Sequence, residues 1–138
     1  MYSFNEEQWP IVSIHNDGET TLADMEKHIA FWERCLARQE PFGVLLTQNG
    51  EAQQSSKEVR ALSNQWRLAN KPRIAQYCAG MAMVTTSSKM LALYKPIAAM
   101  IARKSMGCPG QIFTSKEQAR SWLMQHIEQL TFLYTTRD

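Results

Sequence analysis

The stretch FGVLLTQNG, residues 42–50, decides the fold class of this chain of 138 residues. A short, continuous apolar run closed by Asn49 and Gly50 is typical of a strand that is covered on both faces. We therefore expect residues 42–48 to form a strand near the centre of a sheet. Such a strand needs helical cover, so the pattern favours an α/β fold.

The rest of the chain alternates between strand and helix patterns. Apolar residues that alternate with polar ones indicate strands, and apolar residues spaced three and four apart indicate helices. The strands expected on this basis are residues 2–6, 10–15, 42–48, 78–84 and 111–114. The helices are expected from residue 21 to the break at residue 41, and at residues 56–69, 89–106 and 115–130.

The ends of these helices follow from proline and hydroxyl residues. Pro72 is expected to stop the second helix at residue 69, and Pro96 to force a kink or a late start in the third. Ser55 is expected to cap the second helix by accepting a backbone hydrogen bond, while Glu58 bonds back to it in a capping box. Residues 131–138 fit either an extended segment or a frayed end.

These elements predict one α/β domain that spans residues 1–138. Two strands are followed by helices and strands in alternation, and the last element is a helix. This order implies a mixed sheet of four to five strands with about four helices packed against it. A chain of this length can bury a core without disulfides or metal.

Composition excludes several classes of protein. The chain is 44% hydrophobic and 20% charged, which is ordinary for a soluble globular protein. Its longest apolar-rich run, residues 90–102, is interrupted by Lys95 and Pro96 and is shorter than the roughly 20 residues that span a bilayer. The start of the chain does not resemble a secretory signal, and the 3 cysteines lack C-x-x-C spacing. We therefore expect a cytoplasmic protein without a disulfide, metal site, cofactor or phosphate-binding glycine loop.

Charge is distributed unevenly along the chain although the net charge is only +2. Residues 1–56 are strongly acidic, whereas residues 57–104 contain a single acid, Glu58, among many bases. Eight of these bases form a predicted interaction face on the second and third helices: Lys57, Arg60, Arg67, Lys71, Lys89, Lys95, Arg103 and Lys104. Such a face suits an acidic protein partner or an anionic lipid surface, and its alternative is an ordinary solvated surface. The sequence is compatible with a homodimer, and it predicts no nucleic-acid partner.

The segment KMLALYKPIAAMIARKSMG, residues 89–107, has little polar surface and is rich in methionine, as is the strand before it. One interpretation is core packing, because methionine fills irregular gaps. The other is an adaptable apolar groove between the third helix and the sheet, which would hold an acyl chain, a partner helix or a membrane surface. The residues proposed for that groove are Met90, Leu91, Tyr94, Ile97 and Ile101.

A family resemblance rests on four landmarks: PIVSI at residues 10–14, FGVLLTQNG, RIAQYCAGMAMVTTSS at 73–88, and GQIFTSKEQARSWL at 110–123. Over about residues 9–130 the chain resembles the STAS/SEC14-type, SpoIIAA-like bacterial family, which is related to anti-sigma-factor antagonists. The resemblance implies a helix-covered sheet and a non-catalytic regulatory or protein-interaction module. Its SEC14-like side implies a second possibility, a binding protein for a lipid or other apolar anionic ligand.

The same resemblance marks Ser55 and Ser56 as a candidate phosphorylation switch. In the antagonists the segment reads Asp-Ser-Ser-Gly and its first serine is phosphorylated, whereas here Gln54 and Lys57 replace the flanking residues. Every predicted helix in this chain begins with hydroxyl residues, so capping alone accounts for both serines.

The sequence contains few candidate catalytic residues. Cys108, in the loop Gly-Cys-Pro-Gly after two bases, is the candidate reactive thiol. The 3 histidines lack a carboxylate or thiol partner at motif spacing. The sequence therefore predicts a protein that is not an enzyme.

Overall fold

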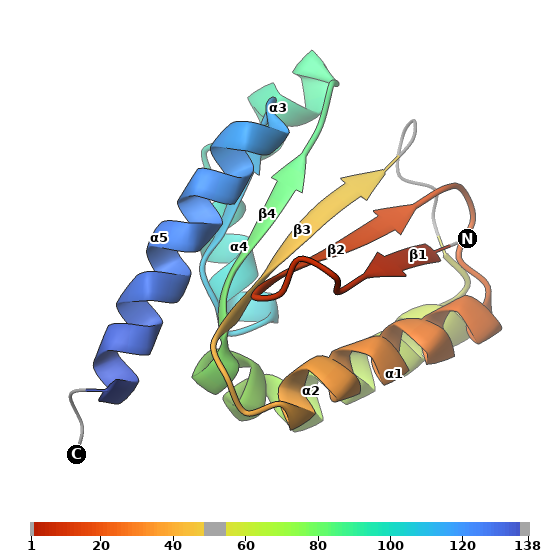
Figure 1. Ribbon diagram of the computed structural model, residues 1–138. Helices are drawn as coiled ribbons and strands as arrows, with labels where there is room; N and C mark the ends of the chain where they lie inside the picture. The colour runs from red at the N-terminus through yellow and green to blue at the C-terminus, as the bar shows by residue number, and fades with distance from the viewer. Residues whose placement is uncertain (1, 49–54, 136–138) are drawn as a thin grey trace.

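The computed structural model describes residues 2–48 and 55–135, and a five-stranded sheet with helices on both faces is its centre (Figure 1). The strands lie in the order in which they occur along the chain, with β1 antiparallel to β2 and all other neighbours parallel. They are β1 (Tyr2–Asn5), β2 (Ile11–Asn16), β3 (Phe42–Gln48), β4 (Cys78–Val84) and β5 (Gly110–Phe113). The predicted α/β class, the mixed sheet and the central place of residues 42–48 are confirmed.

Five helices connect and follow these strands in the described residues: α1 (Leu22–Ala37), α2 (Lys57–Tyr77), α3 (Ser88–Tyr94), α4 (Ala98–Ser105) and α5 (Lys116–Thr135). Figure 1 shows α5 on one side of the sheet and α1 and α2 on the other. None of the described helices combines the length and the apolar character that crossing a membrane requires.

The apolar run of β3 is explained by cores on both faces of the sheet. Val44 belongs to a cluster with Trp32 of α1, whereas its neighbour Leu45 belongs to a cluster with Leu123 of α5. Successive side chains of a strand point to opposite faces, so a strand that is covered by helices on both faces is apolar on both faces.

Proline marks two differences from the sequence prediction. α2 does not end at residue 69 but continues through Pro72 to Tyr77. Contacts beyond the proline hold the helix there, because Ile74 is completely buried and Arg73 is paired with Glu33 of α1. At Pro96, by contrast, the predicted third helix divides into α3 and α4, and neither of these has a buried residue to hold a continuous helix together.

The hydroxyl caps are present, but one is shifted by a residue. The Ser56 hydroxyl, not that of Ser55, accepts the backbone N–H of Val59 at 3.2 Å and begins α2, so the predicted Ser55 capping box is wrong. Ser55 instead offers its carbonyl to Arg60 at 2.6 Å. Residues 131–135 of the tail continue α5, while the Asn49–Gly50 turn, Gln54 and residues 136–138 lie outside the described residues.

α4 approaches β5 closely through Gly110. A Cβ atom added at Gly110 would lie 2.3 Å from the Cβ of Ala102, far inside van der Waals contact. The hydrogen at this position therefore sets how closely α4 can pack on the edge of the sheet.

We expect Gly110→Ala to lower the free energy of unfolding by about 1–3 kcal/mol, because the added methyl group overpacks this contact. Ala102→Gly alone should cost about 1 kcal/mol through helix propensity. The double variant should lose less than the sum of the two, because the space is restored. Urea unfolding of the four proteins measures this, and strictly additive losses would contradict the contact.

Candidate functional site

Two adjoining cavities lie on the sheet face that α1 and α2 cover. We call the first, of about 250 Å³, the polar cavity; it lies at the carboxyl ends of β2 and β3 under α1 and α2, and Asn16, His28 and Arg67 are among its residues. We call the second, of about 370 Å³, the methionine groove; it lies between the sheet and α3–α4. Both are lined in part by the same residues, namely Leu46, Met81, Met83 and Met106.

The methionine groove is the place that the sequence predicted between the third helix and the sheet. Met90, Tyr94 and Ile101 line it, whereas Leu91 and Ile97 do not, and Ile97 is 39% exposed. The groove is also lined by four residues that were not expected there from the sequence: Ala98, Ala102, Gly110 and Ile112. For Ala98 and Ala102 the available signal was their spacing of four residues, which places two small side chains on one face of a helix.

α3 and α4 surround this groove without contributing to the core. Neither helix has a buried residue, although both are rich in apolar side chains. Leu93 is 58% exposed and Met100 is 64% exposed, so part of this apolar surface also faces outward. The segment therefore packs around a space on its inner side and also exposes apolar side chains to the outside.

Three polar side chains of the polar cavity each have a buried atom without a hydrogen-bond partner among the described residues. These atoms are Asn16 Oδ1, His28 Nδ1 and Arg67 Nε. They come from β2, α1 and α2, respectively, and all three residues line the same cavity. Because a buried polar group without a partner costs about 1–3 kcal/mol, such a cluster points to a site that recognises another molecule.

His28 is held in one tautomer. Trp32 Nε1 donates to His28 Nε2 at 3.0 Å, and burial lowers the pKa of His28 to about 4, so the ring is neutral near pH 7. A neutral imidazole that accepts at Nε2 carries its hydrogen on Nδ1. The ring of Tyr2 lies 4.7 Å from that of His28, which helps to fix its orientation. His28 Nδ1 is thus a rigidly placed donor.

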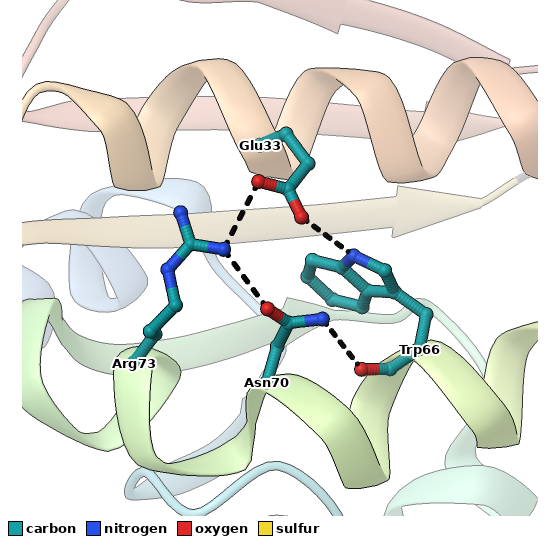
Figure 2. Close-up of polar contacts among 4 residues, drawn as sticks. All are labelled: Glu33, Trp66, Asn70 and Arg73. Carbon is teal, nitrogen blue, oxygen red and sulfur yellow. Dashed lines mark hydrogen bonds and ion pairs between the residues drawn. The ribbon is translucent and has the colours of Figure 1, made fainter.

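A polar clamp, made of Glu33, Trp66, Asn70 and Arg73, joins α1 to α2 (Figure 2). Trp66 Nε1 donates to one oxygen of Glu33 at 2.9 Å, and Arg73 Nη1 donates to the other at 3.0 Å. Arg73 also donates to Asn70, which in turn donates to the Trp66 carbonyl. The hydrogen bond from Trp66 and the nearby Arg73 lower the pKa of Glu33. The clamp fixes Trp66, which lines the cavity.

Only part of the predicted basic face is exposed to solvent. Lys57, Arg60, Lys89, Lys95, Arg103 and Lys104 are exposed, whereas Arg67 and Lys71 are half-buried. Lys71 Nζ donates to the Lys104 carbonyl at 2.9 Å, which places the second half of α2 beside the end of α4. Arg67 lines the polar cavity and donates to Asn64 on its own helix.

The surroundings of Cys108 and of the two serines, Ser55 and Ser56, differ from those expected from the sequence. Cys108 is 1% exposed and packs in the same core cluster as Cys78, so the solvent access that a reactive thiol needs is missing. Ser56 is used as a cap, and Ser55 is half-buried beside Arg60. The phosphorylation switch at these two serines stays a prediction. In the described residues no three side chains of His, Cys, Asp or Glu gather as metal ligands.

The fold is similar to that of a solved structure, an uncharacterized protein of the DUF3478 family from Shewanella loihica PV-4 with a SpoIIAA-like fold. The two align with a TM-score of 0.60 and 16% sequence identity, over 89% of this chain and 92% of the other. No protein-family model and no curated protein matches the sequence. At this identity the likeness shows a shared fold, so the resemblance to SpoIIAA-like proteins is confirmed at the level of the fold.

Burial of His28 makes the stability of the protein dependent on pH. Between pH 6.5 and about 4 the unfolded chain binds a proton at residue 28 that the folded chain does not bind. The free energy of unfolding therefore falls as the pH drops through this window, with a contribution of up to about 1.4 kcal/mol per pH unit. His28→Gln, which keeps an acceptor for Trp32, should lose this contribution.

Urea unfolding at a series of pH values measures that difference between the wild type and His28→Gln. The control is His126→Gln on α5, which leaves His28 in place and should keep the slope of the wild type. An unchanged slope in His28→Gln would contradict the buried, neutral state of the ring.

Proposed function

We propose that this chain is a non-catalytic binding protein whose methionine groove takes up the apolar part of a small lipid-like ligand. The observation that carries the proposal is that α3 and α4 enclose a groove of about 370 Å³ with apolar side chains while burying none of their own. Ligand cavities are commonly about 300–1,000 Å³, apolar and few in a protein.

The chemistry of the groove suits a flexible hydrocarbon. Burial of an apolar group gains about 0.8 kcal/mol for each CH₂. Methionine side chains can rearrange around ligands of different shape, because they are unbranched and polarizable. Met81, Met83, Met90 and Met106 supply such surface from both the sheet and the helices.

A binding role fits better than catalysis because the lining of the two cavities contains few groups that could act in acid–base or nucleophilic chemistry. Among the described residues that line them there is no carboxylate, lysine or thiol, and the titratable side chains are Tyr2, His28, Arg67 and Tyr94. General acid–base and nucleophilic catalysis require a base within hydrogen-bonding reach of a second active group. Thr47 of the lining is hydrogen-bonded to His15 at 2.6 Å, but His15 itself lines neither cavity, and no carboxylate of the described lining joins this pair.

Filling the groove should abolish uptake of an apolar probe. We expect Ala98→Phe, at a residue that lines the groove, to weaken the binding of N-phenyl-1-naphthylamine at least about tenfold, because the ring occupies space that several methylene groups would fill. The measurement is a fluorescence titration with this neutral, apolar dye.

The matched control is Ala99→Phe at the next residue, which is exposed and does not line the groove. Circular dichroism melting shows whether both variants are folded. If the dye does not bind the wild type, or binds Ala98→Phe and Ala99→Phe alike, the groove is not a ligand site.

A second candidate function, the docking of an acidic protein partner, is supported by the outer side of α3 and α4. Exposed Leu93 and Met100 lie in a segment, residues 88–105, whose charged residues are all basic: Lys89, Lys95, Arg103 and Lys104. An apolar patch ringed by one sign of charge is typical of a surface that binds an oppositely charged partner.

Charge reversal tests this second candidate. Lys89→Glu/Lys95→Glu should lower the affinity for a purified partner, identified by crosslinking, by about tenfold or more, mainly through slower association. Surface plasmon resonance at two salt concentrations measures this. Lys116→Glu on α5 is the control, and an equal effect of both variants would mean that the α3–α4 surface has no special part in docking.

A further inference from the structure

We propose that the polar cavity binds the head group of the ligand, that this head group is a carboxylate, and that His28 Nδ1–H and the Arg67 guanidinium are its donors. The ligand would then be a single-chain carboxylic acid of the fatty-acid type. This inference rests on the proposed function, because the methionine groove must hold the chain that carries the carboxylate.

The first support is the convergence of unpaired polar atoms on one cavity. Among the described residues, Asn16 Oδ1, His28 Nδ1 and Arg67 Nε are buried and lack a partner, and all three residues line the polar cavity. His28 Nδ1 and Arg67 Nε carry hydrogens, so both are donors. Asn16 Oδ1 is an acceptor that an ionised carboxylate would not pair, whereas the two donors call for a molecule that brings acceptor oxygens.

The second support is charge. Of the described residues that line the polar cavity, only Tyr2, His28 and Arg67 are titratable. Since burial keeps His28 neutral near pH 7, Arg67 is the one positive charge of this lining. A carboxylate has one negative charge and matches it, whereas a phosphate monoester brings about −1.5 to −2 and would be left partly unpaired. Hydrogen bonds to an ionised partner are about twice as strong as neutral ones.

The third support is the rigidity of the donors. His28 accepts from Trp32 at 3.0 Å and its ring lies tilted against that of Tyr2, and Arg67 donates from another guanidinium nitrogen to Asn64. The Glu33 clamp holds Trp66 at the side of the same cavity. Donors that are already oriented lose little entropy when a ligand binds, which favours affinity and selectivity.

The fourth support is the shared wall of the two cavities. Leu46, Met81, Met83 and Met106 line both of them. A carboxylate at His28 and Arg67 would therefore have an apolar surface beside it that leads to the methionine groove. The strand residues of this wall lie towards the carboxyl ends of β3 and β4, the edge of a parallel sheet where ligands commonly bind.

The test compares three probes with the same twelve-carbon chain and different head groups. Dodecanoate, dodecanol and dodecyl phosphate each displace N-phenyl-1-naphthylamine from the wild-type protein in a fluorescence competition. We expect dodecanoate to bind about 10- to 100-fold more tightly than dodecanol, as charge-assisted hydrogen bonds would give. Dodecyl phosphate should bind more weakly than dodecanoate.

Variants then assign the preference to residues. Arg67→Gln and His28→Gln should each lower the affinity for dodecanoate more than the affinity for dodecanol, and so reduce the preference for dodecanoate. Arg60→Gln is the matched control, because Arg60 lies on the same helix, is exposed and lines neither of the two cavities; it should keep the preference. The wild-type comparison decides the head group even if a variant fails to fold.

The outcomes separate this inference from the proposed function. If dodecanoate and dodecanol bind equally well, the carboxylate site is wrong and the apolar groove stands. If dodecyl phosphate binds more tightly than dodecanoate, the head group is a phosphate and the carboxylate assignment is overturned. If none of the three displaces the dye, or the dye itself does not bind, both proposals fail.

Discussion

The constraint on which the structure depends is the direction of its parallel connections. From β2 to β5 each connection moves one strand further across the sheet, and parallel crossovers share one handedness. Helices α1, α2 and α4 are therefore brought to one face of the sheet, and α5 alone covers the other. These three helices share the first face, and the spacing between them decides where cavities remain above the sheet.

That spacing is set by close contacts on either side of the two cavities. The Glu33 clamp ties α2 to α1, and Gly110 lets α4 sit directly on β5. Between them, Leu46, Met81 and Met83 of the sheet are left to line open volume. The cavities thus lie where α1, α2, α3 and α4 leave the sheet incompletely covered.

The segment from α3 to α4 has the character of a low-stability part of the fold. Its helices are short, are interrupted at Pro96 and bury no residue, whereas α1 and α5 each place several residues in a core. Elements with few buried contacts open at lower free energy than the core, and binding sites are often built from them. A ligand in the groove would supply the apolar contacts that this segment does not make with the protein, and would stabilise the fold by mass action.

The sequence by itself determined the α/β class, the order of the elements and three residues of the methionine groove, because periodicity records which side of an element faces apolar surroundings. It misplaced the α2 cap and the end of α2, and it did not reveal that the candidate thiol Cys108 is buried, because these depend on contacts from distant parts of the chain. Only the tertiary structure decided the polar cavity. Asn16, His28 and Arg67 come from three different elements, and they meet because the packing of α1 and α2 on the sheet brings them to one place.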